Sequence, residues 1–176
     1  MMFSNFPTTT TTSTTKPTQT TNNTFSSSQN VTKRLQMELM KMMSSKIPGV
    51  SAFPNGSNMT NWIATIEGKE GIYEGLRYKL NIQFGNDYPY KAPTVTFVTP
   101  CFHPNVDLAG NICLDILKDQ WSASYNIPTI LMSIQSLLND PNTSSPLNVD
   151  ASNLWENQEE YKKVLLSKYK QATLKK

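Results

Sequence analysis

The stretch from His103 to Trp121 reads HPNVDLAGNICLDILKDQW, and it holds the only histidine and one of the two cysteines of the 176-residue chain. A turn signal at residues 107–111, in which a glycine supplies the positive φ of a tight turn, comes just before Cys113. This pattern predicts a sulfur that is presented where a turn enters an extended, apolar segment. Asn105 lies upstream in the same loop and carries an amide that can donate hydrogen bonds. A thiol nucleophile and an amide donor for an oxyanion are the minimum parts of an acyl-transfer site.

The bulk composition narrows the class of protein. Hydrophobic residues make up 38% of the chain, and no apolar run approaches the ~20 residues of a membrane span. The N-terminus lacks the features of a secretory signal or a mitochondrial transit peptide. The net charge of +3 is too small to indicate nucleic-acid binding by itself. With no export signal, two cysteines predict free thiols in a reducing compartment, and a Cys101–Cys113 disulfide is the alternative.

The N-terminal part divides into a polar segment and a helix. Residues 1–30 are mostly Thr, Ser and Asn and bury too little apolar surface to offset their chain entropy. We therefore expect a disordered tail there, ahead of a folded domain at residues 31–176. Helical spacing of apolar residues predicts a helix over residues 31–46, with Asn30 as its N-cap and Pro48 as its stop. The apolar residues of that spacing are Val31, Leu35, Leu39, Met42 and Met43.

The middle of the chain predicts a sheet covered by a helix. The strands are expected at residues 61–67, 77–84 and 94–99. Short glycine-containing links between them predict an antiparallel meander with one apolar face. Residues 127–138 carry a wide apolar stripe, so this helix is expected to cover that face. Two further helices are predicted to follow, capped by Asp150 and Asn157, which makes an α+β layer architecture.

Several motifs resemble the signature of one family, the ubiquitin-conjugating enzymes. They are HPN at residues 103–105, GNICL at 110–114, WS at 121–122, YPYKAP at 88–93, DPN at 140–142 and SPL at 145–147. The resemblance covers residues 31–176, and it implies the ubiquitin-conjugating-enzyme fold: an N-terminal helix, a four-stranded antiparallel meander, a central helix and C-terminal helices. Within the family the chain is similar to the branch that serves the anaphase-promoting complex. That narrower resemblance is carried by residues 33–36, 112–118, 121–123 and 133–138.

The resemblance implies two successive acyl transfers at Cys113. The thiol would accept the ubiquitin C-terminus as a thioester from the activating enzyme, and a substrate lysine would then attack that thioester. Asn105 would hold the oxyanion or its loop, and His103 would brace the loop. Ser144 and Ser145 would border the approach of the lysine, where many relatives carry an acid, so what activates the lysine stays open. No cofactor is expected, because the activating enzyme would consume the ATP.

The resemblance also implies partner surfaces. The activating enzyme would dock on Lys33, Arg34, Met37 and Lys41. A RING-type ligase would dock on Tyr90, Ser122, Ala123 and Ser124. The donor ubiquitin would contact Met132 and Ser136, and a second ubiquitin would bind near Ser51. The family often has proline in place of Ala123, which favours a narrow choice of ligase, the anaphase-promoting complex. The resemblance to this branch also favours a role in cell-cycle protein degradation in the cytoplasm and nucleus. Without the resemblance these surfaces are ordinary solvated faces, and that alternative stays open; nucleic-acid and membrane partners are not expected.

Other kinds of protein fit parts of the pattern. A Cys–His hydrolase would use His103 as the base for Cys113, although no papain-like or caspase-like signature surrounds the cysteine. A zinc site of Cys101, His103 and Cys113 lacks the usual fourth ligand, so no metal is expected. A non-catalytic ubiquitin-binding variant of the fold would lack the cysteine. A conjugating enzyme for another ligase, or for a ubiquitin-like modifier, is the remaining alternative.

Overall fold

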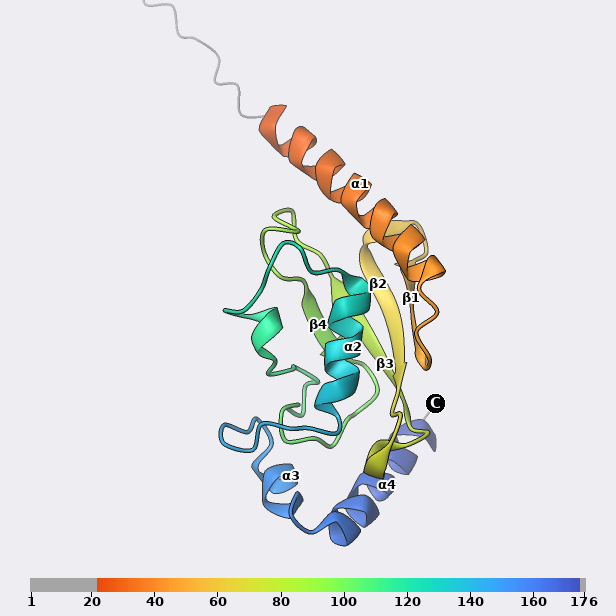
Figure 1. Ribbon diagram of the computed structural model, residues 1–176, viewed down its shortest axis with the longest axis vertical. Helices are drawn as coiled ribbons and strands as arrows, with labels where there is room; N and C mark the ends of the chain where they lie inside the picture. The colour runs from red at the N-terminus through yellow and green to blue at the C-terminus, as the bar shows by residue number, and fades with distance from the viewer. Residues whose placement is uncertain (1–21, 175–176) are drawn as a thin grey trace, which may run out of the picture.

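The computed structural model describes residues 22–174, with side chains described from residue 30 onward (Figure 1). In chain order its elements are α1 (Asn22–Ser44), β1 (Val50–Asn55), β2 (Asn58–Glu67), the 3-10 helix η1 (Gly71–Tyr73), β3 (Arg77–Gln83), β4 (Thr94–Phe97), the 3-10 helix η2 (Asp115–Leu117), α2 (Ile127–Leu137), α3 (Val149–Leu154) and α4 (Gln158–Leu174). The four strands form one antiparallel sheet in the order β1-β2-β3-β4. The predicted α+β meander is therefore confirmed.

The core lies between the sheet and α2. On β3 the side chains of Tyr78, Leu80 and Ile82 are fully buried, as the alternation predicts. The apolar stripe of α2 is buried as well and consists of Ile127, Ile130, Leu131 and Ile134. Figure 1 shows α2 in front of the sheet, with α1 at one end of the molecule and α3 and α4 at the opposite end. Helices thus lie at both ends of the sheet. The long connection from β4 to α2 consists of residues 98–126.

The first helix is longer than predicted, because it begins at Asn22 and not after an N-cap at Asn30. Residues 22–30 contain no proline or glycine, and adding a residue to an existing helix costs only tenths of a kcal/mol even for Ser, Thr and Asn. The buried residues Val31 and Leu35 anchor the helix, so its extension upstream needs no new nucleus. The rest of the predicted tail, residues 1–21, lies outside the described residues.

Two other local predictions are wrong for identifiable reasons. The strand β1 escaped prediction because Ala52 is its only buried residue and Pro54 interrupts it, which is tolerated at the edge of a sheet. The cap of α3 is Asn148, whose side chain accepts from the Ala151 N–H at 3.1 Å, and Asp150 lies inside the helix. Asn157 does accept from the Glu160 N–H at 3.2 Å, as the capping prediction for α4 requires. Within residues 22–174, no helix is long and apolar enough to span a membrane.

Candidate active site around Cys113

The predicted turn before Cys113 is present and is held by short-range hydrogen bonds. The Asp107 carboxylate accepts from the Ala109 N–H at 2.9 Å and from the Asn111 N–H at 2.8 Å. The Asn111 side-chain amide donates a third bond, and chiefly for this reason the pKa of Asp107 is lowered. Gly110 has φ +87°, and a Cβ there would collide with the carbonyl oxygen of Phe97. Only glycine fits this close approach without a shift of the backbone.

The turn delivers Cys113 to a cleft between the following loop and α2. The Cys113 N–H donates to the Asn105 carbonyl at 2.9 Å, and the thiol is half-buried. The cleft has a volume of about 860 Å³. Its lining includes Asn105, Cys113, Asp115, Lys118, Asp119, Met132, Ser136, Asp140 and Asn142.

Asn105 ties two loops together across the base of the cleft. Its side chain is 1% exposed. Its Nδ2 donates to the Asn142 carbonyl at 2.7 Å, and its Oδ1 accepts from the Asn142 N–H at 2.8 Å. These bonds bring the backbone of residue 142 against the loop of residue 105. Because an amide nitrogen carries two hydrogens, Asn105 keeps a second donor beyond the bond to Asn142.

His103 is fully buried and uses both ring nitrogens structurally. Nε2 lies 2.8 Å from the Leu137 carbonyl oxygen, which can only accept, so this nitrogen carries the proton. Nδ1 accepts from the Asn105 N–H at 3.0 Å. Burial lowers the pKa of His103 to about 4, so the ring is neutral at physiological pH. This arrangement fits the loop-bracing role and leaves no ring nitrogen free to act as a base for Cys113.

Lys118 is a site residue that sequence reasoning missed. Its Nζ donates to Cys113 Sγ at 3.2 Å. The intervening 3-10 turn makes this possible, because the Lys118 N–H donates to the Asp115 carbonyl at 2.9 Å and folds the chain back. The cleft also contains three carboxylates, those of Asp115, Asp119 and Asp140, of which only Asp140 belongs to a motif named above. The only sequence signal for the lysine was a basic residue shortly after the cysteine, which is uninformative without the turn.

The predicted residues of donor-ubiquitin contact line the cleft, whereas those of the lysine approach lie outside its lining. Met132 and Ser136 are exposed on α2 and line the cleft directly. Ser144 is exposed in the adjacent loop, where its N–H and Oγ both donate to Asn142 Oδ1, at 3.0 and 2.6 Å. Ser145 is exposed beside it, and neither serine is part of the cleft lining.

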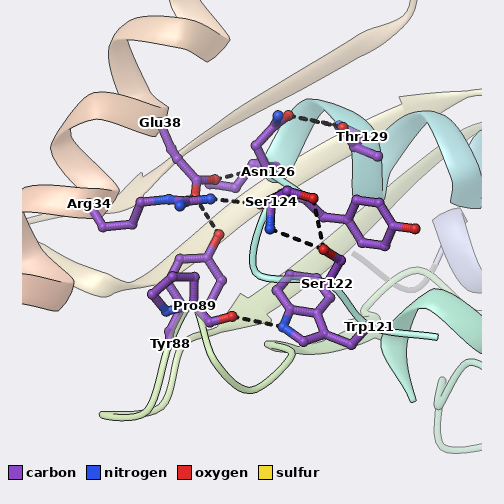
Figure 2. Close-up of polar contacts among 11 residues, drawn as sticks. Arg34, Glu38, Tyr88, Pro89, Trp121, Ser122, Ser124, Asn126 and Thr129 are labelled. Carbon is purple, nitrogen blue, oxygen red and sulfur yellow. Dashed lines mark hydrogen bonds and ion pairs between the residues drawn. The ribbon is translucent and has the colours of Figure 1, made fainter. Parts of the chain in front are cut away.

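The two loops predicted to bind a ligase lie side by side (Figure 2). Trp121 Nε1 donates to the Pro89 carbonyl at 2.8 Å and joins them. Tyr90, 83% exposed, follows Pro89 directly. In the second loop the hydroxyls of Ser122 and Ser124 are paired at 2.8 Å around Ala123, which is half-buried. The structure therefore brings together residues that the sequence holds far apart.

The predicted docking face for the activating enzyme is only partly assembled on α1. Lys33, Met37 and Lys41 are exposed, as expected. Arg34 is not part of this open face, since it turns inward and its Nη2 donates to the Tyr125 carbonyl at 2.7 Å. The predicted apolar residue Met43 is 69% exposed. On β1, Ser51 is exposed on the surface of the sheet, as the prediction of a wet face requires.

Comparison with known proteins agrees with this geometry. Residues 34–169 match the sequence model of the family described as "Ubiquitin-conjugating enzyme". The chain is 54% identical over 145 residues to a Schizosaccharomyces pombe protein named ubiquitin-conjugating enzyme E2-20 kDa, covering 81% of this chain and 82% of the relative. It is 46% identical over 133 residues to a Fusarium solani protein named ubiquitin-conjugating enzyme E2 2, covering 74% of this chain and 88% of the relative. An Aspergillus fumigatus protein of the same name is 46% identical over 136 residues, covering 76% and 90%. The chain therefore belongs to the ubiquitin-conjugating enzymes, a family that transfers ubiquitin.

Proposed function

We propose that Cys113 carries ubiquitin as a thioester and passes it to substrate lysines. The support is the arrangement of a thiol, an amine and an amide in one cleft of the chain. In the first step the Cys113 sulfur attacks the carbonyl carbon of the activating enzyme's thioester. A new C–S bond forms while the C–S bond to the activating enzyme's cysteine breaks, and the proton lost by Cys113 ends on that departing sulfur. The observation that carries this proposal is that Cys113 opens into a cleft of about 860 Å³, with Lys118 Nζ 3.2 Å from its sulfur.

Lys118 is assigned the role of steadying the sulfur. An ammonium donates a charge-assisted hydrogen bond, which is stronger to a sulfur that carries negative charge than to a neutral one. Negative charge appears on Cys113 when it attacks and again when it leaves. Lys118 is thus placed to help both steps, and His103, with both nitrogens occupied, is assigned to bracing.

In the second step a substrate amine attacks the Cys113 thioester. The C–N bond forms, the C–S bond breaks, and negative charge develops on the former carbonyl oxygen. The second Nδ2 hydrogen of Asn105 is assigned to that oxygen. Free lysine has a pKa of ~10.4, so the amine must lose a proton before or during attack. Ser144 and Ser145 carry no carboxylate, so we assign the proton to the carboxylates that line the cleft, on Asp115, Asp119 or Asp140.

Ubiquitin, the activating enzyme and a ligase are the partners that membership of the family implies. We assign the donor ubiquitin to Met132 and Ser136, and the activating enzyme to the exposed residues Lys33, Met37 and Lys41 of α1. The chain itself is proposed to need no cofactor, because the ATP is consumed by the activating enzyme. Action in the cytoplasm and nucleus follows from the cell-cycle role proposed next.

We further propose that the ligase is the anaphase-promoting complex and that the chain acts in cell-cycle protein degradation. The support is the resemblance at residues 33–36, 112–118 and 133–138 together with Ala123 in the ligase loop. The test is multi-ubiquitination of a mitotic cyclin with that ligase, compared with an unrelated RING ligase. Equal or better activity with the unrelated ligase would contradict the assignment.

The core of the proposal is tested by leaving out one component at a time. The full chain is mixed with activating enzyme, ATP and ubiquitin, and an adduct that reductant removes is expected only when all are present. A Cys–His hydrolase would instead cleave a ubiquitin ester without activating enzyme or ATP. A non-catalytic ubiquitin-binding module would form no adduct under any of these conditions. Replacing ubiquitin by ubiquitin-like modifiers in the same assay identifies which modifier is carried.

A further inference from the structure

One buried carboxylate on α1 receives hydrogen bonds from its own helix and from two distant segments of the chain. Glu38 is 3% exposed. Its Oε1 accepts from Arg34 Nε at 2.6 Å and from the Tyr88 hydroxyl, and its Oε2 accepts from the Ile127 N–H at 2.8 Å (Figure 2). Ile127 is the first residue of α2, so the carboxylate also occupies the positive end of that helix.

Two of these donors, Tyr88 and Ile127, flank the two loops that are predicted to bind a ligase. Tyr88 is followed by Pro89, which accepts from the Trp121 indole, and then by the exposed Tyr90. Ile127 follows the second loop, residues 121–126. Arg34 reaches that same loop from the other side, because its Nη2 donates to the Tyr125 carbonyl at 2.7 Å. A single Glu38–Arg34 pair therefore touches the base of both loops.

The geometry of the pair is more specific than stability alone requires. The Glu38 carboxylate of this pair is buried, whereas the Arg34 side chain is 26% exposed. A buried charge is costly to leave without its partners, so Glu38 needs its donors in place. The Arg34 guanidinium lies over the Tyr88 ring, 5.7 Å from its centroid. Two of the donors to Glu38 therefore also contact each other. Burial, and then the Glu38 carboxylate, raise the pKa of Tyr88, so its hydroxyl remains a donor throughout the physiological range.

We propose that Glu38 is a positioning residue, which holds the loops at residues 88–90 and 121–126 in the one relative placement that a ligase recognises. It is buried, does not line the cleft of Cys113, and acts through Tyr88, Arg34 and the first N–H of α2. The inference rests on the proposed function in one respect, namely that these loops bind a RING-type ligase. Its consequence is that transfer stimulated by a ligase depends on Glu38, whereas the unassisted chemistry at Cys113 does not.

The test compares the full chain with its Glu38→Gln and Glu38→Ala variants. Each is loaded with ubiquitin, and single-turnover discharge to free lysine is measured with and without a RING-type ligase. Loss of charged hydrogen bonds to three donors is expected to lower the ratio of assisted to unassisted rates about tenfold in Glu38→Ala. Glu38→Gln still offers an acceptor to Ile127 and should lose less. The unassisted rate should stay within about twofold of the wild-type rate, as expected for a residue outside the site.

Glu67→Gln is the matched control. Glu67 pairs with Arg77 at 2.7 Å, but on the exposed surface of β2 and β3, away from both loops. The ratio of assisted to unassisted rates in Glu67→Gln should equal that of the wild type. A purely structural role for Glu38 would lower the folded fraction, which would reduce both rates together and leave the ratio unchanged. The measurements are therefore made at a temperature at which thermal melts show every variant folded, and an unchanged ratio in both Glu38 variants would overturn the proposal.

Two further readouts keep the inference separate from the proposed function. If the wild-type chain fails to load or is not stimulated by the ligase, the fault lies with the proposed function. Hydrogen exchange of the Trp121 indole N–H then tests the positioning role of Glu38 by itself, because loosened loops should expose the hydrogen bond from this N–H to Pro89. We expect exchange about tenfold faster in Glu38→Ala than in Glu67→Gln, and equal rates would overturn the positioning role. If Glu38→Ala does not fold, Tyr88→Phe removes one donor with little change in volume and is measured in the same way.

Discussion

Cys101 and Cys113 lie on either side of the turn at residues 107–111, and their surroundings differ in every respect that matters for reactivity. Cys101 is buried in the core, and burial raises the pKa of its thiol, so it stays protonated. Cys113 is half-buried at the edge of an open cleft and has Lys118 Nζ at 3.2 Å from its sulfur. Burial and neighbours therefore decide which thiol can act as a nucleophile, and the turn decides which thiol reaches the cleft.

The largest effect on this comparison is expected from Asn105→Ala. The change removes a donor near the proposed Cys113 thioester and leaves the N–H and carbonyl of Asn142 without their partner. Loss of one oxyanion donor typically slows a reaction by ~10²–10³. Single-turnover discharge of the loaded enzyme to free lysine should slow by that factor at a temperature where the variant remains folded.

Asn142→Ala is the control for that change, because the Asn105 side chain bonds to the backbone of residue 142 and not to its side chain. It removes the bonds to Ser144 and keeps those to Asn105. Discharge should therefore stay near the wild-type rate. If Asn105→Ala discharged at the wild-type rate, or if the two variants slowed equally, the oxyanion role would be lost and only the link between the loops would remain.

The next effect is a pH dependence of stability that His103 should create. Burial lowers the pKa of His103 from 6.5 to about 4. Between these pH values the unfolded state binds a proton at His103, whereas the folded state does not. Folding stability is therefore fully present above pH 6.5 and falls as the pH is lowered towards 4, by on the order of 3 kcal/mol.

Urea unfolding of the wild type and of His103→Gln at pH 7 and near pH 4 measures this contribution. The wild type should lose more stability over that interval than the variant, by most of the expected amount. Equal losses would mean that the histidine is not held neutral in the folded state, which would reopen its reading as a base for Cys113.

The smallest effect is expected from Lys118→Met. The variant removes the hydrogen bond to the Cys113 sulfur, and a charged hydrogen bond of about 1.5 kcal/mol corresponds to about tenfold slower transthiolation. Pre-steady-state loading from the activating enzyme is the measurement. Lys163→Met, which removes the same charge from an exposed pair on α4, should load at the wild-type rate. Equal loading of both variants would show that Lys118 is a bystander.

Features that depend on short-range sequence were predictable, and features that depend on the meeting of distant segments were not. The turn before Cys113 could be predicted because Asp107 and Gly110 act on residues of the same turn. The alternation on β3 likewise identified its buried face. Lys118 was missed because its contact with the sulfur requires the 3-10 turn between them.

Glu38 was missed for a different reason. It falls on the buried face of α1 between Leu35 and Met42, where a charged residue reads as an interruption of the apolar stripe. Its burial is understandable only when donors from Tyr88 and Ile127 are known to converge on it, and helical periodicity carries no information about them. A lone acid inside an apolar stripe is nevertheless the signal that could have marked it.

The central claim is that Cys113, and not Cys101, carries ubiquitin. The direct measurement is intact-mass analysis with peptide mapping after incubation with activating enzyme, ATP and ubiquitin, for the wild type, Cys113→Ser and Cys101→Ser. We expect a reductant-sensitive adduct on Cys113 in the wild type and in Cys101→Ser, and a reductant-resistant ester on residue 113 in Cys113→Ser. A thioester on Cys101, or an unaltered thioester in Cys113→Ser, would contradict it.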